Sequence, residues 1–307
     1  MKIILIVGAR PNFMKAAPIL SELKKYPDTF DCLLIHTGQH YDAAMSKFFF
    51  DDLALPKPDI YLGIGSGTHA EQTGKIMIEL EKIFRKENPD LIMVVGDVNS
   101  TMAGALTGAK LCIPIAHVEA GLRSFDRTMP EEINRIVTDS VSRYLFTSCM
   151  EGDENLIKEG HPKNNIYFVG NVMIDTLLKS NKISDSSNIL DILGLKQNGL
   201  LQGYALVTLH RPSNVDDADT LKNIFGALHC VAQDMLIVFP VHPRTRKQIE
   251  GFGMVDWLHT LDDGDGVTRP VPGKINCVNP LGYLDFLKLM ANTKIVLTDS
   301  GGIQEET

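Results

Sequence analysis

The first fifteen residues, MKIILIVGARPNFMK (1–15), decide the fold class. Residues 3–7 form an unbroken apolar run rich in β-branched side chains, and Gly8 permits a tight turn before a helix that Pro11 or Asn12 can begin. Such a run is shorter than the apolar region of a signal peptide and far short of a membrane span. We therefore expect a buried first strand at the start of a cytoplasmic protein without a membrane partner.

The strand, turn and helix of this opening recur along the first half of the chain. Apolar runs lie at residues 3–7, 32–35, 91–95, 114–117, 144–147 and 166–169, and amphipathic stretches lie at 12–25, 69–86 and 101–110. Continuous apolar strands that alternate with helices are typical of a parallel sheet covered on both faces. The first half is therefore predicted to be a doubly wound, Rossmann-like α/β domain.

The same pattern restarts after a polar segment rich in serine and asparagine at residues 177–202. The stretches GYALVTL (203–209), MLIVFPV (235–241), INCVN (275–279) and TKIVLTD (293–299) are predicted strands of a second parallel sheet. We predict two Rossmann-like domains, residues 1–175 and residues 176–307. The second domain is expected to be incomplete, because the chain stops soon after its last strand.

Composition and charge narrow the function. The 307 residues are 44% hydrophobic and 22% charged, with a formal net charge of −8 and no long run of lysine and arginine. A general nucleic-acid binder would show a basic stripe, so nucleic acid is not expected as a partner. A local basic pocket for one anionic ligand remains compatible with an acidic protein. The five cysteines form no C-x-x-C pair, and their apolar neighbours predict that most are buried, reduced thiols.

Polar residues follow several predicted strands, where open α/β sheets bind their ligands. In GARPNFMK (8–15), Arg10 and Lys15 stand at a helix start, which is a natural site for a diphosphate. A solvated arginine and a surface lysine are the alternative. In GDVNST (96–101), Asp97 follows an apolar strand and is a candidate site residue. The alternative roles for Asp97 are those of a helix cap or of a ribose ligand.

Further acidic groups follow the next predicted strand. In HVEAGLRS (117–124), alternation along a strand places His117 and Glu119 on the same side. Glu131, in MPEEINR (129–135), opens a helix and could contribute a third carboxylate to this site. The alternative for Glu131 is a surface ion pair with Arg135, four residues further along one helix face.

The second half offers groups that bind anions. His210 and Arg211 leave one predicted strand in LHRPSN (209–214), and His242 repeats the arrangement in PVHPRT (240–245). Consecutive glycines after Ser300, in TDSGGIQEE (298–306), let backbone amides close on an anion before a helix. Cations and glycines for a diphosphate, together with three carboxylates, favour proton abstraction beside a nucleotide-sugar.

Eight motifs in order resemble those of one family, the non-hydrolysing UDP-N-acetylglucosamine 2-epimerases. They are VGARPNFMK, TGQHYDAAM, VVGDVNST, HVEAGLRS, MPEEINR, LHRPSN, PVHPRT and TDSGGIQEE, and the match runs from residue 3 to the last residue. The resemblance implies a glycosyltransferase-B-like fold of two domains facing across a cleft that holds UDP, and a homodimer. It also implies elimination of UDP to a 2-acetamidoglucal, followed by re-addition with inversion at carbon 2.

The resemblance implies catalytic and binding roles for individual residues of this chain. Its catalytic residues match Asp97, Glu119, Glu131 and His210. Its UDP-binding residues match Arg10, Lys15, His210, Ser300, Gly301, Gly302 and Glu306, to which we add Arg135 and His242 as substrate-binding candidates. Gln39 and His40 match a segment through which some members bind an activating second UDP-GlcNAc, although GSGTHAEQTG (65–74) departs from the associated loop. No metal or other cofactor is expected, because the implied reaction is redox-neutral.

Four alternatives stay open at this point. A related UDP-diacetamido-uronic acid could be the substrate, or a hydrolysing 2-epimerase could release free N-acetylmannosamine and UDP. A glycosyltransferase shares the implied fold but does not need three carboxylates together. A catalytically silent UDP-sugar binder is the fourth, because the chain stops at Thr307 where family members continue.

Overall fold

The computed structural model describes residues 1–38, 57–261, 269–301 and 303. The chain divides into two compact units, Met1–Thr176 (unit 1) and Leu177–Thr307 (unit 2). Each unit contains a parallel sheet with helices on both faces, so the predicted class of two Rossmann-like α/β domains is confirmed.

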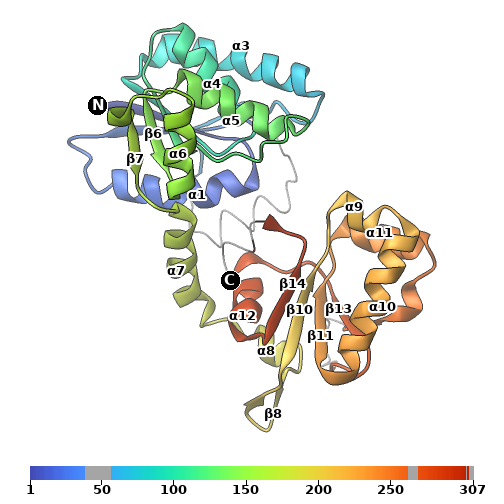
Figure 1. The fold of residues 1–307 in the computed structure, drawn as a ribbon. Coiled ribbons are helices and arrows are strands. Elements are labelled where there is room, and N and C mark those ends of the chain that lie inside the picture. Colours follow the sequence, from blue (N-terminus) through green and yellow to red (C-terminus); the bar gives the residue numbers. More distant parts are fainter. Residues whose placement is uncertain (39–56, 262–268, 302, 304–307) are drawn as a thin grey trace. The chain divides into compact units, whose positions relative to one another are not determined.

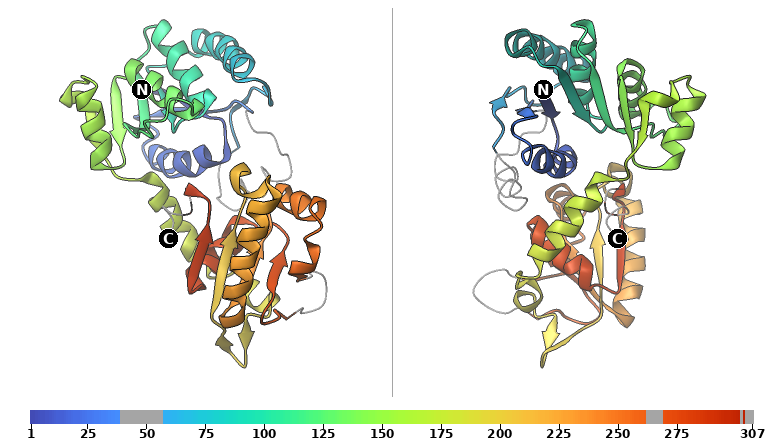
Figure 2. Two further views of the ribbon diagram at one scale, coloured as in Figure 1. Left: turned by 45° about the vertical axis from the view of Figure 1, so that its right-hand side comes forward. Right: turned by 90° about the vertical axis from the view of Figure 1, so that its left-hand side faces the viewer.

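Unit 1 is built on a parallel sheet whose described strands run in the order β3-β2-β1-β4-β5-β6-β7. The strands are β1 (Lys2–Val7), β2 (Asp31–His36), β3 (Ile60–Tyr61), β4 (Leu91–Val95), β5 (Ile115–Ala120), β6 (Tyr144–Thr147) and β7 (Ile166–Phe168). The helices are α1 (Arg10–Leu23), α3 (His69–Glu87), α4 (Asn99–Lys110), α5 (Pro130–Val141), α6 (Met150–Lys158) and the short η1 (Lys163–Asn165). Helices α3, α4 and α5 cover one face of the sheet and α1 covers the other (Figures 1 and 2).

The opening strand lies at the centre of this sheet, as its apolar run predicts. β1 pairs with β2 on one side and with β4 on the other. Ile4 and Leu5 are completely buried, and burial of one such side chain contributes about 1.5–3 kcal/mol to folding. The order of the strands reverses between β1 and β4, which puts the first two polar motifs at the reversal.

Unit 2 has a smaller parallel sheet in the order β12-β13-β11-β10-β14. Its strands are β10 (Tyr204–Thr208), β11 (Leu236–Pro240), β12 (Leu258–Thr260), β13 (Ile275–Val278) and β14 (Ile295–Thr298), beside a hairpin of β8 (Lys196–Gln197) and β9 (Leu200–Leu201). Its helices are α8 (Ile189–Ile192), α9 (Pro212–Val215), α10 (Ala218–Asp234), α11 (Pro243–Gly251), η2 (Val255–Trp257) and α12 (Tyr283–Asn292), and α7 (Val172–Ser184) leads into the unit from unit 1. Helices α10 and α11 cover one face and α12 the other (Figure 1).

The expected burial of most cysteines is wrong. Cys277 on β13 is buried, but Cys112 and Cys230 are exposed and Cys32 and Cys149 are half-buried. Cys112 lies in the turn after α4 with a φ of +58°. Apolar neighbours in the sequence do not fix the direction of a side chain in a turn or on the outer face of a helix. Within the described residues, no helix has the length and hydropathy that a membrane span requires.

Candidate active site

Two loops of unit 1 are tied together where the strand order reverses, between the carboxyl ends of β1 and β4. Asn12, on the first turn of α1, is buried there. Its Oδ1 accepts hydrogen bonds from the amides of Gly8 (3.3 Å) and Ala9 (3.0 Å), and its Nδ2 donates to the carbonyl of Val95 (2.8 Å). Ligands of open α/β sheets bind at such a reversal, so Asn12 fixes the floor of the candidate site.

Lys15 and Glu119 form an ion pair beside this floor. Their side chains are 10% and 13% exposed, so the pair is largely shielded from water. Glu119 has a φ of +71°, a conformation that costs a residue other than glycine about 1–3 kcal/mol and that clusters at functional sites. The carboxylate is therefore held in a strained position next to a fixed cation.

A β-bulge produces the unusual backbone of Glu119. Val118 pairs with Phe146 and Ala120 pairs with Thr147, so Glu119 is an extra residue opposite β6. A bulge re-aims a side chain and interrupts the alternation of a strand. We predicted that His117 and Glu119 lie on the same side of the strand because side chains alternate along a strand. The bulge interrupts this alternation between the two residues.

Asp97 is held by two consecutive residues of α5. Arg135 donates to its carboxylate at 2.5 Å, and Asn134 donates to its backbone carbonyl at 2.8 Å. The alternative of a surface ion pair between Arg135 and Glu131 is wrong, because the carboxylate partners of Arg135 are Asp97 and Glu132. Glu131 lies half-buried in the first turn of α5, and its place beside the other carboxylates stays a prediction.

Glu132, rather than Glu131, organises the loop before α5. Its buried carboxylate accepts from the amides of Ser124 (2.9 Å) and Phe125 (3.0 Å) and from Arg135 (2.7 Å). Burial alone would raise the pKa of Glu132, but these hydrogen bonds to the charged form outweigh it and lower the pKa to about 2.

We expect the stability of unit 1 to depend on Glu132 in acid. The pKa of Glu132 is lowered on folding from its usual 4.5 to about 2, so its contribution is complete above pH 4.5 and is lost as the pH falls through 2. The difference in unfolding free energy between the wild type and Glu132→Gln should therefore shrink by up to about 3 kcal/mol from pH 6 to pH 2. Urea unfolding followed by circular dichroism measures it, and a constant difference would contradict the assignment.

Asp299 organises the candidate site of unit 2. It follows β14 and accepts from the backbone amides of His210 (2.9 Å) and Arg211 (2.8 Å) and from the side chain of Asn214 (3.1 Å). It also contacts Nδ1 of His210 at 2.8 Å. Burial would raise the pKa of Asp299, but the backbone hydrogen bonds and the other donors lower it. The loops after β10 and β14 are thus fixed by one carboxylate, which leaves the Nε2 edge of the His210 ring for a ligand.

The other described candidates of unit 2 follow neighbouring strands. His242 caps α11, where its Nδ1 accepts from the amide of Arg244 at 3.2 Å, and its ring centroid lies 6.1 Å from that of His210. The amide of Ser300 donates to Oγ1 of Thr298 at 2.9 Å. A side chain at Gly301 would come within 3.9 Å of Arg211, so the start of the glycine turn and this cation are close.

Several predicted site residues lie outside the described residues: Gln39, His40, Gly302 and Glu306. For Arg10 the description covers the backbone, as the first residue of α1. The roles of these five residues stay predictions. In the described part of the chain, no group of three or more His, Cys, Asp or Glu is placed to hold a metal ion.

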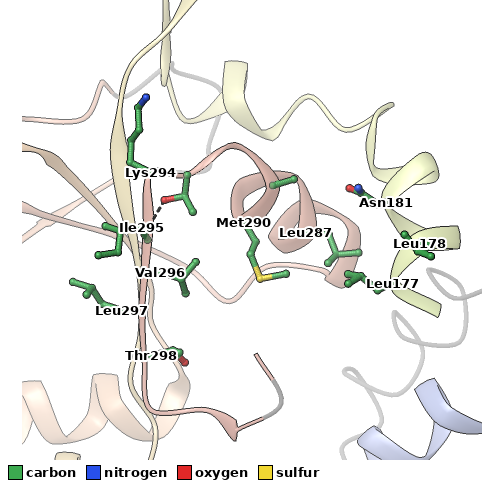
Figure 3. Close-up of a pocket in the computed structure, with 12 residues that line it drawn as sticks. Leu177, Leu178, Asn181, Leu287, Met290, Lys294, Ile295, Val296, Leu297 and Thr298 are labelled. Atoms are coloured by element: carbon green, nitrogen blue, oxygen red, sulfur yellow. Dashed lines mark hydrogen bonds between the residues drawn. The ribbon is translucent and has the colours of Figure 1, made fainter. Parts of the chain in front are cut away.

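A pocket of about 750 Å³ in unit 2 has a different character from these polar clusters. β14, α12 and the second half of α7 line it, with Leu177, Leu287, Met290 and Ile295 among the apolar residues (Figure 3). The described residues that line it include the cation Lys294 but no arginine, no histidine and no glycine. Diphosphate sites combine several cations with backbone amides, so we place the candidate site at the strand ends and not in this pocket.

Known proteins of one family are similar to this chain. The model of the UDP-N-acetylglucosamine 2-epimerase family matches residues 21–307. A homolog of this epimerase from Methanococcus maripaludis is 47% identical over 308 residues, which cover 100% of this chain and 80% of the relative. The chain belongs to the UDP-N-acetylglucosamine 2-epimerase family. The resemblance drawn from the eight motifs is confirmed.

Two further members of the epimerase family bear on the substrate. The crystal structure of Methanocaldococcus jannaschii UDP-GlcNAc 2-epimerase in complex with UDP-GlcNAc and UDP has a TM-score of 0.81 and 45% identity, covering 100% of this chain and 81% of that chain. A UDP-2,3-diacetamido-2,3-dideoxy-D-glucuronate 2-epimerase from Pseudomonas aeruginosa is 42% identical over 309 residues, which cover 100% of this chain and 80% of the relative. The family thus includes enzymes for more than one UDP-sugar.

The sequence analysis missed several polar residues near the site, although the pattern of α5 indicated some of them. Asn134, Thr138 and Asp139 on α5 are buried, although the core-facing stripe of a helix is normally apolar. Polar residues recurring at helical spacing on a buried face indicate a helix that turns toward a polar site. Asn12 and Asp299 offered no comparable pattern, because each acts through loops from distant parts of the chain.

Proposed function

We propose that this epimerase-family chain interconverts UDP-N-acetylglucosamine and UDP-N-acetylmannosamine. The observation that carries the proposal is the pair of carboxylates at the strand ends of unit 1, each fixed by a cation. Glu119 contacts Lys15 and Asp97 contacts Arg135. Inversion at carbon 2 needs proton transfer on both faces of that carbon, and two positioned carboxylates meet this need.

The proposed reaction has two balanced steps. A carboxylate removes the proton from carbon 2, the C1–C2 double bond forms, and the bond from carbon 1 to the β-phosphate oxygen breaks with its electron pair leaving on UDP. The intermediate is a 2-acetamidoglucal. In the second step carbon 2 is protonated from the opposite face while the phosphate oxygen of UDP adds to carbon 1, so no water is consumed. Asp97, Glu119 and Glu131 are the proposed acid–base groups.

We assign UDP to unit 2. Departure of UDP places negative charge on the β-phosphate, and donors already in position stabilise such charge most effectively. The ring of His210 is held at Nδ1 by Asp299, and a Cβ at Gly301 would lie 3.9 Å from the guanidinium of Arg211, so the imidazole, this cation and the start of the glycine turn are already in position. His242, Gly302 and Glu306 complete the proposed contacts of unit 2 with UDP and the sugar.

The test is incubation of the protein with UDP-GlcNAc in D2O, followed by proton NMR. We expect loss of the sugar H2 signal and growth of an anomeric signal of UDP-ManNAc, with no free sugar. Accumulation of UDP and N-acetylmannosamine would replace the proposal by a hydrolysing epimerase. Retention of H2 in UDP-GlcNAc and in the second sugar nucleotide considered below, together with UDP binding, would make the chain a silent binder.

The Pseudomonas aeruginosa relative supports a second candidate substrate, the UDP-diacetamido-uronic acid that it is named for. The chemistry at carbon 2 is the same, so the two candidates differ only in the groups that contact carbons 3 and 6 of the sugar. Parallel NMR incubations with both sugar nucleotides separate them. Exchange of H2 in the uronic acid alone would assign that substrate in place of UDP-GlcNAc.

Replacement of Asp299 should weaken UDP binding. Asp299→Asn puts an amide donor among the backbone amides of His210 and Arg211 and removes the anchor of the His210 ring. Loss of a charge-assisted hydrogen bond costs about 1.5–3 kcal/mol, so we expect the Kd for UDP to rise about 10- to 100-fold. Calorimetric titration with UDP measures it. Asp191→Asn, which breaks a surface ion pair with Lys196, is the control, and equal Kd values for the two variants would refute the role.

The family resemblance also leads us to propose a homodimer. Light scattering coupled to gel filtration should give twice the mass of one chain. A mass equal to one chain at micromolar concentration would contradict the homodimer. The proposed reaction would not be affected by that result, because the NMR assay tests it independently.

A further inference from the structure

His117, on β5, is fully buried, and both of its ring nitrogens face an oxygen. Nδ1 lies 2.6 Å from Oδ1 of Asp139 on α5, and Nε2 lies 2.8 Å from the carbonyl oxygen of Gly96. A neutral imidazole has one N–H and one lone pair, whereas the protonated ring donates from both nitrogens. Arg123 and the amide of Gly121 contact the other oxygen of Asp139 and favour its ionised form. With Asp139 ionised, only the imidazolium satisfies both contacts, so this geometry holds a cation inside unit 1.

Charged groups from β5, α5 and the loop after β5 surround this ring. Arg123 lies 2.7 Å from the carboxylate of Asp139 and 2.7 Å from that of Glu159, while Glu119 adds a further negative charge near the ring. Burial opposes the charge on His117, but Asp139 and the hydrogen bonds of the ring outweigh it and raise its pKa. Burial likewise opposes the charge on Asp139, and its cationic partners lower its pKa.

The buried ion pair holds the backbone beside candidate catalytic groups. Gly96, whose carbonyl contacts His117, directly precedes Asp97 and has a φ of +69°. The second oxygen of Asp139 accepts from the amide of Gly121 at 3.1 Å, two residues after the bulged glutamate of β5. A buried ion pair is weak evidence for stability, because apolar residues of similar volume often stabilise a core equally well. We therefore explain these buried charges by the fixed geometry that they give to the loops after β4 and β5, and not by a gain in stability.

We propose that His117 is a positioning residue for proton transfer at carbon 2: anchored as an imidazolium on Asp139, it fixes the carbonyl of Gly96 and with it the carboxylate of Asp97. The inference rests on the proposed function, since it takes Asp97 as an acid–base group. The His117 side chain is fully buried, so it cannot contact a ligand, and it acts on Asp97 through the backbone of Gly96. Its loss should therefore lower kcat and leave the KM for the UDP-sugar nearly unchanged.

The charge can be measured without activity. Protein labelled with ¹⁵N-histidine is titrated from pH 6 to pH 9 by NMR, and the His117 signals are assigned by their absence from His117→Gln. We expect both ring nitrogens of His117 to stay protonated at pH 8. His36 is the internal reference, because burial lowers its pKa to about 4 and keeps it neutral. A neutral His117 ring at pH 8 would overturn the imidazolium.

Two isosteric variants separate the contacts of the ring. The amide nitrogen of Asn overlays Nδ1, so His117→Asn keeps a donor toward Asp139 and loses the contact with Gly96. The amide nitrogen of Gln overlays Nε2, so His117→Gln keeps the donor to Gly96. Misplacement of a reacting group costs up to about 100-fold in rate. We expect kcat to fall about 10- to 100-fold in His117→Asn, with partial recovery in His117→Gln and KM within about threefold of wild type.

The outcomes separate positioning from simple stability. If kcat of both variants follows their melting temperatures alone, or if His117→Asn turns over at the wild-type rate, the positioning role is wrong. If the wild type exchanges H2 in neither sugar nucleotide, the proposed function fails and the positioning role fails with it. The NMR titration then still decides whether the buried ring is charged.

Discussion

Glu119→Gln should turn over UDP-GlcNAc about 100- to 10,000-fold more slowly than the wild type, the range that general acid–base catalysis contributes. Glutamine has the shape of the side chain but neither accepts nor returns a proton at neutral pH. The backbone at Glu119 is held by the bulge in β5 and not by its charge, so the substituted side chain should occupy the same place. Loss of the H2 signal in D2O, measured as an initial rate, reports the first proton transfer directly.

The substitution also removes the carboxylate that Lys15 contacts, and a buried ion pair that loses one partner can cost about 3–5 kcal/mol in stability. Melting temperature must therefore be measured beside the rate. The double variant Lys15→Met, Glu119→Gln removes the stranded charge and should restore stability without restoring turnover. Glu154→Gln, in an exposed pair with Lys158 on α6, is the control that should leave both unchanged. An active Glu119→Gln would exclude Glu119 as an acid–base group.

Long apolar strands and capped helices were predictable because their causes are local. The runs at Leu91–Val95 and Tyr144–Thr147 coincide with β4 and β6, and α3 begins directly after Thr68, whose side chain accepts from the amide of Glu71. The short strands β3, β8, β9 and β12 were not predicted. Two or three residues are too few to show a period, and such strands form because a neighbouring strand offers hydrogen bonds.

The candidate site was predictable as a set of residue types after strands, but not as a set of contacts. Arg135 pairs with Asp97, 38 positions away, whereas the sequence offered Glu131 on the same helix as the alternative partner. The positive φ of Glu119 follows from the pairing of β5 with β6. Both depend on tertiary geometry, which overrides local spacing wherever a site is assembled from several elements.

Gly121→Ala should destabilise unit 1 by at least about 3 kcal/mol, at the upper end of the usual range for one substitution. Gly121 has a φ of +80°, and a Cβ there would lie 2.3 Å from the carbonyl oxygen of Gly152 on α6. The left-handed backbone alone costs alanine about 1–2 kcal/mol, and the clash is with backbone, which cannot rotate away. For a unit of this size the melting temperature should fall by about 6–12 °C.

Gly74→Ala is the matched control for Gly121→Ala. Gly74 lies inside α3, and a Cβ there meets no atom within 4 Å, so alanine should stabilise the helix by about 0.5–1 kcal/mol. Both variants add one methyl group to unit 1. We expect their changes in unfolding free energy to have opposite signs, because of the two glycines only Gly121 has a positive φ and lies close to another stretch of backbone. Since the amide of Gly121 donates to Asp139, its displacement should also lower kcat at temperatures where the protein stays folded. A Gly121→Ala protein as stable as Gly74→Ala would show that α6 does not pack against the end of β5 in this way.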